Sequence, residues 1–269
     1  MLKHLKYIFC MASTIVLILS LTILPSYAGL IFSGIAFDAE VAPGQPFEHD
    51  INVKNNDTDP MDLTADVLGY SQSQDGVTVG VEKDLDTSSY SAREFIKISP
   101  SNFHLEPGAS QKVIVSGTVP SNIGNGGRYA VVNIRTLPMG NGTIGMALAA
   151  NIAIRLTVEG SNLIETGKIK SAELSEIGQT KDSYLSVIFE NTGNHHYNAK
   201  AKAVLRSKDS DAVTSVESQL SERPIIPTSS RLFKLPLDDN LASGIYTLDA
   251  SIIHENGTIL DSEEETIEI

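Results

Sequence analysis

The stretch IGMALAANIAIRLTVEG, residues 144–160, decides the fold. Its even-numbered positions from 144 to 158 are all apolar, and the odd-numbered positions between them are small or polar. A helix would need apolar residues at spacings of three and four, whereas strict alternation places every large apolar side chain on one face of a β-strand. The pattern therefore predicts a strand over residues 144–158.

A strand of this length would span roughly 50 Å, whereas a usual strand spans about 17 to 20 Å. One sandwich core cannot cover the whole apolar face, so part of the row should lie at an edge or extend towards a second domain. Two interpretations stay open. The strand could pair with a strand or groove of another protein, or it could be covered by its own sheet and the second domain.

The same alternation recurs along the chain in short segments that are separated by turns. Residues 47–53, 63–67, 77–81 and 113–115 alternate in this way, and YLSVIFEN, RLFKLPL and GIYTLDASIIH continue the pattern in the second half. Such spacing is typical of antiparallel β-sandwiches. We predict an all-β chain of two tandem immunoglobulin-like sandwiches, residues 29–160 and 161–269, which meet at EGSNLIE.

The first 28 residues are typical of an export signal. Lys3 and Lys6 precede a long apolar run, and Ser26 and Ala28 are small residues at the spacing of a cleavage site. We expect residues 1–28 to be a signal peptide, with the mature protein periplasmic or at the cell surface. The alternative is a retained membrane anchor, because the apolar run is nearly long enough to span a bilayer.

Cleavage would remove the one cysteine, Cys10, and would change the formal charge from −13 to −15, because residues 1–28 hold two lysines and no acidic residue. A strongly acidic protein is a poor ligand for nucleic acid and for anionic lipid. We therefore expect neither nucleic acid nor, after cleavage, a membrane as partner.

The sequence shows no motif of a catalytic site, so we predict a protein that is not an enzyme and uses no cofactor or metal. Weaker candidates remain. NNDTDPMD, residues 55–62, could offer carboxylates to Ca²⁺, whereas His195 and His196 are expected in a solvent-exposed turn. Arg128 and Arg135 are expected to be solvated, and the glycines of residues 123–127 to form a tight turn.

Three segments of the first half form a recognisable set, namely ISPSNFHLEPGASQKVIV (98–115), GGRYAVVNIRTLP (126–138) and ALAANIAIRLTVEG (147–160). Through them, residues 30–160 resemble the first domain of PapD-like periplasmic pilus chaperones. It implies an assembly factor whose last strand lends alternating apolar side chains to a pilus subunit-like or surface protein. On this basis the partner-binding residues would be Met146, Leu148, Ile152, Ile154, Arg155 and Leu156, with Arg155 as a charged anchor.

Two departures bear on this resemblance. The chaperones bind the subunit's terminal carboxylate with an Arg on the first strand and a Lys on the last. Arg155 falls near the Lys position, but LIFSGIAFDAEVAPGQPF, residues 30–47, holds no basic residue. The second half is similar to generic surface immunoglobulin-like modules. The first half is also similar to the peptidoglycan-binding domain of WxL-interacting proteins, which leaves binding of cell-wall polysaccharide as an alternative function.

Overall fold

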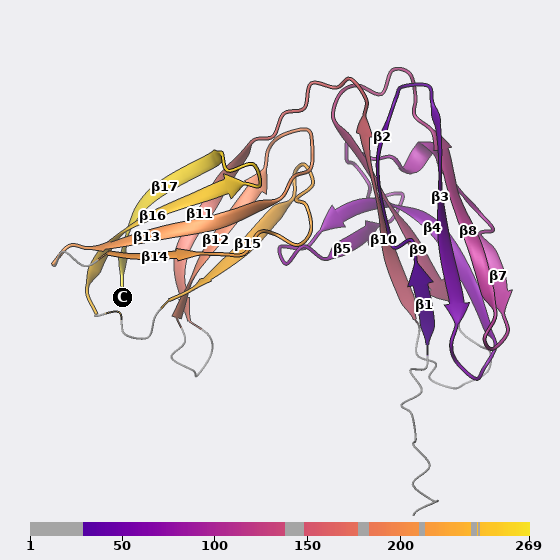
Figure 1. Cartoon of the computed structure of the whole chain (residues 1–269), viewed down its shortest axis with the longest axis horizontal. Helices are drawn as coiled ribbons and strands as arrows, with labels where there is room; N and C mark the ends of the chain where they lie inside the picture. Colours follow the sequence, from indigo (N-terminus) through magenta and orange to yellow (C-terminus); the bar gives the residue numbers. More distant parts are fainter. Residues whose placement is uncertain (1–28, 138–147, 177–182, 210–212, 238–240, 242) are drawn as a thin grey trace, which may run out of the picture.

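The computed structural model describes residues 29–137, 148–176, 183–209, 213–237, 241 and 243–269. Its strands form two sandwiches, one ending at Val158 and the other beginning at Gly167 (Figure 1). The prediction of an all-β, immunoglobulin-like fold is confirmed. The one helical element in the described part of the chain is η1, Arg93–Phe95. Residues 1–28, expected to be a signal peptide, lie outside the described residues.

The first sandwich packs two sheets face to face. One has the order β1-β3-β8-β6, and the other has the order β2-β10-β9-β4-β5, with β7 beside β4. The strand bounds are β1 Leu30–Ser33, β2 Ala36–Val41, β3 Pro46–Asn55, β4 Met61–Gln72, β5 Thr78–Val81, β6 Ile96–Ser99, β7 Asn102–Leu105, β8 Ser110–Thr118, β9 Gly127–Thr136 and β10 Ala149–Val158.

The start of the described chain passes from one sheet of this sandwich to the other. β1 pairs antiparallel with β3, and β2 pairs parallel with β10. Between them Gly34 adopts a φ of 74°, a left-handed conformation that glycine tolerates best. The parallel pair departs from the purely antiparallel sandwich that the sequence predicts, because the strand changes sheet without reversing its direction.

The second sandwich packs a sheet of order β11-β12-β15 against one of order β14-β13-β16-β17. The strand bounds are β11 Gly167–Glu176, β12 Ser183–Asn191, β13 Ala199–Ser207, β14 Val213–Glu217, β15 Ser230–Pro236, β16 Ile245–His254 and β17 Ile259–Glu268.

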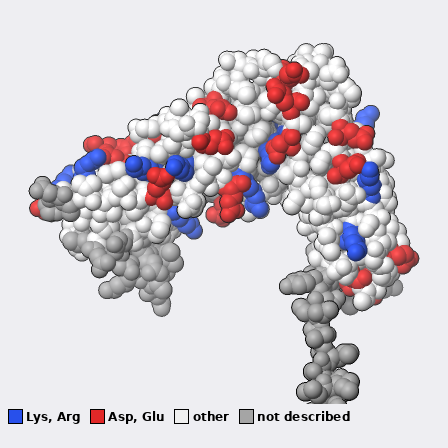
Figure 2. All heavy atoms as spheres, viewed as in Figure 1, with Lys and Arg blue, Asp and Glu red and all other residues white. Residues whose placement is uncertain are grey.

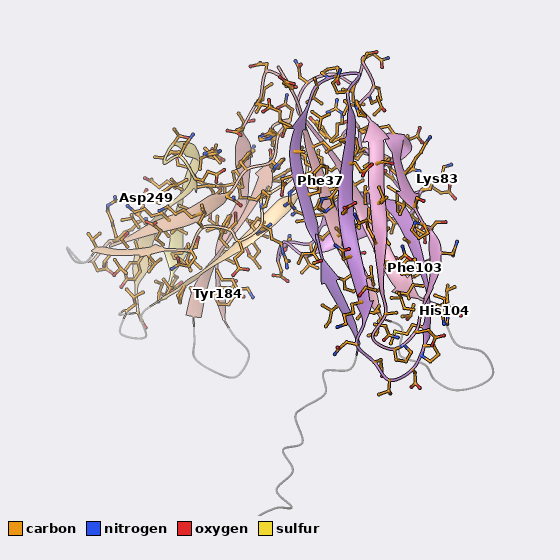
Figure 3. All side chains as sticks on the ribbon, turned by 45° about the vertical axis from the view of Figure 1, so that its right-hand side comes forward. Phe37, Lys83, Phe103, His104, Tyr184 and Asp249 are labelled. Carbon is orange, nitrogen blue, oxygen red and sulfur yellow. The ribbon has the colours of Figure 1, made fainter. Side chains whose placement is uncertain are left out.

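Each sandwich has its own apolar core, built from the inward positions of alternating strands. In the first, Ile51 and Val53 of β3 face Val132 and Ile134 of β9 in one buried cluster. The second is built from the following buried residues: Leu185, Val187, Phe189, Tyr197, Ala199, Ala201, Ala203, Leu205, Phe233, Leu235, Leu248 and Ile252. Side chains fill both interiors (Figure 3); Phe37 of β2, labelled there, stacks on Phe47 with ring centroids 6.1 Å apart.

A third, smaller cluster joins the two sandwiches. It holds Tyr70, Tyr129, Val131 and Ala153 of the first sandwich and Ile226 of the second. The β4–β5 hairpin extends from the first sandwich towards β15 (Figure 1). The boundary at residue 160 that the sequence predicts stays a prediction; that residue lies in the segment between β10 and β11.

Candidate functional site

Strand β10 carries the alternation that the sequence shows, with its even-numbered side chains facing the first core. Ile152, Ile154 and Leu156 are almost completely buried there, while Leu148 and Ala150 are partly buried. Ala149 and Asn151 point to the opposite face and are exposed. Met146, also predicted as a partner-binding residue, lies outside the described residues.

The second half of β10 is not an edge. It pairs with β9 as far as Thr157 on one side, and with β2 from Ala153 to Val158 on the other. Ile154 and Leu156 therefore belong to a fully paired stretch, and their side chains fill the protein's own core. That these two residues contact a partner stays a prediction; in this structure both their backbone and their side chains are occupied within the chain. Ile152 is also buried, so its side chain supports the strand from inside.

The first half of β10, from Ala149 to Ile152, pairs only with β9. In an antiparallel pair, hydrogen-bonded and non-bonded positions alternate. The Thr136 N–H donates to the Leu148 carbonyl, and the Val158 N–H donates to the Gly126 carbonyl. The main-chain N–H and C=O groups of the even-numbered residues of β10 therefore point towards β9. The N–H and C=O groups of Ala149 and Asn151 are therefore directed away from β9, and no other strand of the described residues pairs with this edge, which we call the open edge.

Arg155 lies on the outer face of β10, within the fully paired half. Its Nε and Nη2 donate to the two carboxylate oxygens of Asp38 on β2, at 2.5 and 2.6 Å. Burial alone would lower the pKa of Arg155, but the hydrogen bonds and charge of Asp38 outweigh it and raise the pKa above its ordinary value. Arg155 was predicted to anchor a partner; here its charge is matched within the chain.

Asp38 is the residue that the sequence did not single out. Asp38 is acidic, whereas the family resemblance implies a second cation in residues 30–47; its position on β2, directly opposite Arg155, follows only from the pairing of β2 with β10. The two side chains form a bidentate pair, the strongest common arrangement of guanidinium and carboxylate. A terminal carboxylate of a partner would have to compete with Asp38 for this guanidinium.

The turn between β12 and β13 brings two histidines to the domain junction. His195 Nε2 lies 3.1 Å from the Thr157 hydroxyl, and His196 Nδ1 lies 3.2 Å from the Tyr129 hydroxyl. Each imidazole side chain is only 14% exposed. The expectation of a solvent-exposed turn is wrong, because the turn packs against the first sandwich rather than projecting into water.

The buried position of His196 has an electrostatic consequence. Burial, followed by the nearby charges of His195 and Arg155, lowers the pKa of His196 to about 3. Asp38, whose Oδ1 lies 3.8 Å from His196 Nε2, acts in the opposite direction. The imidazole is therefore neutral in the folded junction at physiological pH.

Arg128, expected at the surface, is also buried. Its guanidinium donates to the main-chain carbonyls of Ile123, Asn125 and Gly127, and thereby closes the glycine-containing turn before β9. Arg135 is half exposed and pairs with Asp66 at 2.7 Å. The predicted turn is present, with Gly124 and Gly126 at positive φ.

The loop with three carboxylates, residues 55–62, is organised by an amide. Asn55 is fully buried; its side-chain nitrogen donates to the Asp59 and Leu105 carbonyls, and its oxygen accepts the Asp57 N–H. In the described part of the chain, no group of three or more His, Cys, Asp and Glu residues is placed to hold a metal ion. No helix there has the length and apolar character needed to cross a membrane.

Comparison with known proteins gives distant structural similarity. No protein-family model and no curated protein sequence matches the chain. A chain from a chaperone–tip adhesin complex of CFA/I fimbriae is 16% identical, with a TM-score of 0.45 over 86% of this chain and 97% of that one. The class 5 fimbriae chaperone CfaA is 13% identical, with a TM-score of 0.44 over 88% and 98%.

The E. coli chaperone DraB is 14% identical, with a TM-score of 0.41 over 88% of this chain and 96% of its own. Each of these TM-scores is below 0.5, so they describe a likeness and do not establish a function. The function is inferred below from the strands and side chains of this chain.

Proposed function

We propose that this chain is an exported, non-enzymatic binding protein of the cell envelope that pairs with a strand of a partner protein. The observation that carries the proposal is the open edge of β10, where the main-chain groups of Ala149 and Asn151 face away from β9. An unpaired strand edge is a template for another strand, and recognition by strand addition uses such groups.

The surroundings of this edge are apolar enough to receive a strand. Leu148 and Ala150 of β10 and Leu30 and Phe32 of β1 are only partly buried, and Leu30, Phe32 and Ala150 pack against the first core. Ile31 on β1 is 51% exposed. A partner strand could pair with β10 beside Ala149 and Asn151, on the same side of β10 that β2 occupies from Ala153 onwards. Its apolar side chains would then be buried against this end of the sandwich.

This proposal places five of the six predicted residues in different roles. Leu148 would contact the partner, whereas Ile152, Ile154 and Leu156 would hold the strand in shape from inside. Arg155 would fix β2 beside β10 through Asp38 and thereby define where the open edge ends. The partner would be a pilus subunit-like or surface protein, as the sequence resemblance implies, and the site would be periplasmic or at the cell surface.

A proline at position 149 tests the proposal. Ala149 is exposed and is the first residue of β10, where proline is tolerated best, and its N–H is directed away from β9. Ala149→Pro removes one donor from the open edge, whereas Ala149→Val keeps the donor and favours strand structure. We expect labelled peptides with alternating apolar residues to bind the full chain and the valine variant equally, and to bind the proline variant about tenfold or more weakly, by fluorescence anisotropy.

Circular dichroism and thermal unfolding of both variants provide the control for folding. Equal peptide affinities for the proline and valine variants would contradict pairing at this edge. Charged residues at Ile152 or Ile154 are unsuitable for this purpose, because they would disrupt the core rather than the edge. The alternative of polysaccharide binding gains no support from the comparisons, and co-sedimentation with purified cell wall would detect it.

A further inference from the structure

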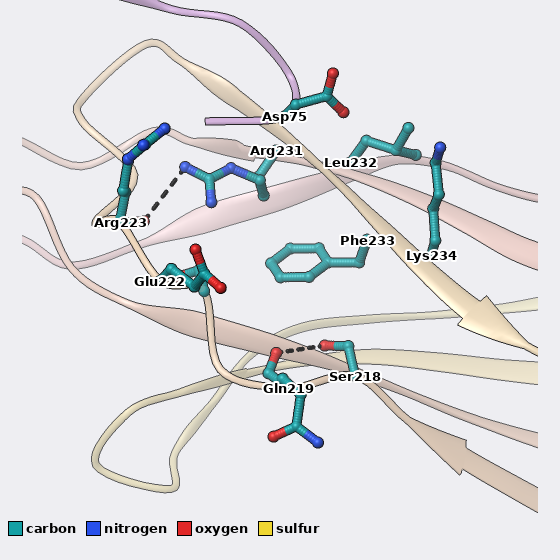
Figure 4. Close-up of a pocket in the computed structure, with 10 residues that line it drawn as sticks. Asp75, Ser218, Gln219, Glu222, Arg223, Arg231, Leu232, Phe233 and Lys234 are labelled. Carbon is teal, nitrogen blue, oxygen red and sulfur yellow. Dashed lines mark hydrogen bonds between the residues drawn. The ribbon is translucent and has the colours of Figure 1, made fainter. Parts of the chain in front are cut away.

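A pocket lies between the two sandwiches, away from the open edge of β10. Figure 4 shows it below the β4–β5 turn, which carries Asp75, and along β15, which carries Arg231 and Phe233. Its volume is about 330 Å³. The segment before β15 contributes Arg223 and Glu222.

Arg231 is a nearly buried cation without a matching anion. Arg231 is 7% exposed, and its Nε is buried without a hydrogen-bond partner. Its Nη2 donates to the Arg223 carbonyl at 3.3 Å, and the guanidinium makes no other hydrogen bond to the described residues. No carboxylate of those residues lies within ion-pair distance of Arg231. Because a guanidinium stays charged in proteins, this burial is unfavourable unless an anion compensates it.

Arg223 adds a second positive charge at the same place. Its Nη1 donates to the Gly76 carbonyl at 3.3 Å, which holds the side chain at the junction. Burial and the charge of Arg223 both lower the pKa of Arg231. Two guanidinium groups that are close enough to repel each other form a local positive site on a protein of net charge −13.

The hairpin fixes Arg231 in place. Gly76 has a φ of 79°, and a Cβ at this position would lie 2.5 Å from Arg231 Cζ. The absence of a side chain therefore allows the turn to approach the guanidinium closely. A cation that is held in this way is preorganised for a ligand and loses little conformational entropy on binding.

We propose that this pocket binds a carboxylate group, with the guanidinium groups of Arg231 and Arg223 as donors. A planar guanidinium matches a carboxylate in shape and in donor geometry. Lys234 also lines the pocket, and Asp75 and Glu222 offset two of its three positive charges. The remaining single positive charge favours a monoanion over a doubly charged phosphate or sulfate. Phe233, on the same face of β15 as Arg231, supplies apolar surface for the rest of the ligand. The site is independent of strand pairing at β10.

The test is a titration of the full mature chain with sodium acetate, followed by two-dimensional amide NMR at constant ionic strength. We expect saturable shifts confined to the pocket residues and to the β4–β5 turn. Arg231→Met should weaken acetate binding by about tenfold or more, because it removes a charged donor. The same variant without acetate should be at least as heat-stable as the unaltered chain, because an unpaired buried charge is removed.

Arg223→Gln, at an exposed position, provides a second variant if Arg231→Met fails to fold, and it should also weaken binding. Arg135→Gln makes the same change of net charge on the first sandwich and should leave acetate affinity unchanged. Shifts that rise linearly without saturation would overturn the site, as would equal losses in all three variants. Phosphate or sulfate binding as tightly as acetate would overturn its assignment to a carboxylate.

Discussion

Several polar side chains of this protein are buried at turns, where they replace missing backbone hydrogen bonds. Asn191, fully buried at the end of β12, donates to the His195 and Ile225 carbonyls and accepts the Gly193 N–H. Asn55 does the same at the end of β3. The two sandwiches thus use the same device, in which one amide satisfies three main-chain groups that would otherwise be buried without partners.

At the residue scale, His196 predicts a pH-dependent stability. The pKa of His196 is about 3 in the folded protein, against an ordinary value of 6.5, so the folded junction binds fewer protons than the unfolded chain. Above about pH 6.5 this group does not change the free energy of unfolding. As the pH falls from 6.5 towards 3, it lowers the free energy of unfolding progressively, by roughly 2 kcal/mol at pH 5. The groups that face it are Asp38 on β2, Arg155 on β10, Tyr129 on β9 and the adjacent His195.

Urea unfolding at pH 7.5 and pH 5 measures this effect. We expect His196→Gln to lose about 2 kcal/mol less between the two pH values than the unaltered chain does. His104→Gln, which changes an exposed histidine of β7, is the matched control. This variant should keep most of the pH dependence of the free energy of unfolding. A His196→Gln variant with the full pH dependence would show that another group is responsible.

At the scale of the element, one uniform sequence pattern gives a strand with two different halves. Every even-numbered residue of β10 faces the first core, from Ala150 to Val158. The outer face and the edge change along the strand, because β2 begins to pair only at Ala153 and the second sandwich covers the outer face near Ala153. Within the described residues, the open edge therefore exists only before Ala153, where β2 does not pair with β10.

This division predicts a large effect on stability for one substitution in β10 and almost none for another. Ile154→Ala removes a fully buried side chain and should lower the free energy of unfolding by about 2 to 5 kcal/mol. Ala149→Val, on the exposed face, should change it by less than about 0.5 kcal/mol. Chemical denaturation of both variants measures the difference, and a comparable loss in each would contradict the assignment of faces.

At the scale of the whole molecule, the two sandwiches are joined by a built interface rather than by the connecting segment alone. Gln72 of β4 donates to the Pro224 carbonyl and accepts the Ile226 N–H, at 2.9 and 3.1 Å. Charged side chains of both signs are spread over both sandwiches in the view of Figure 2. Because an apolar cluster and these hydrogen bonds join them, we expect the two sandwiches to unfold interdependently.

Loss of Ile226 should therefore weaken the coupling between the sandwiches. Ile226 is 3% exposed and belongs to the junction cluster. We expect Ile226→Ala to separate one calorimetric transition into two, because each sandwich keeps its own core while their contact is reduced. Leu220→Ala, at an exposed site of the second sandwich, should leave the transition unchanged. A single transition in Ile226→Ala would indicate coupling through other contacts.

The sequence by itself determined the strands and their faces, because the period of two is a local property that side chains of each segment express directly. It therefore predicted the sandwich architecture and that Ile152, Ile154 and Leu156 share one face of their strand, but it assigned that face to a partner. Only the tertiary structure decided that β2 closes half of the β10 edge, that Asp38 neutralises Arg155, and that Arg231 lies buried without an anion. These features depend on which segments, distant in the sequence, come into contact. Alternation specifies on which face of its strand a side chain lies, but it does not specify which segment packs against that face.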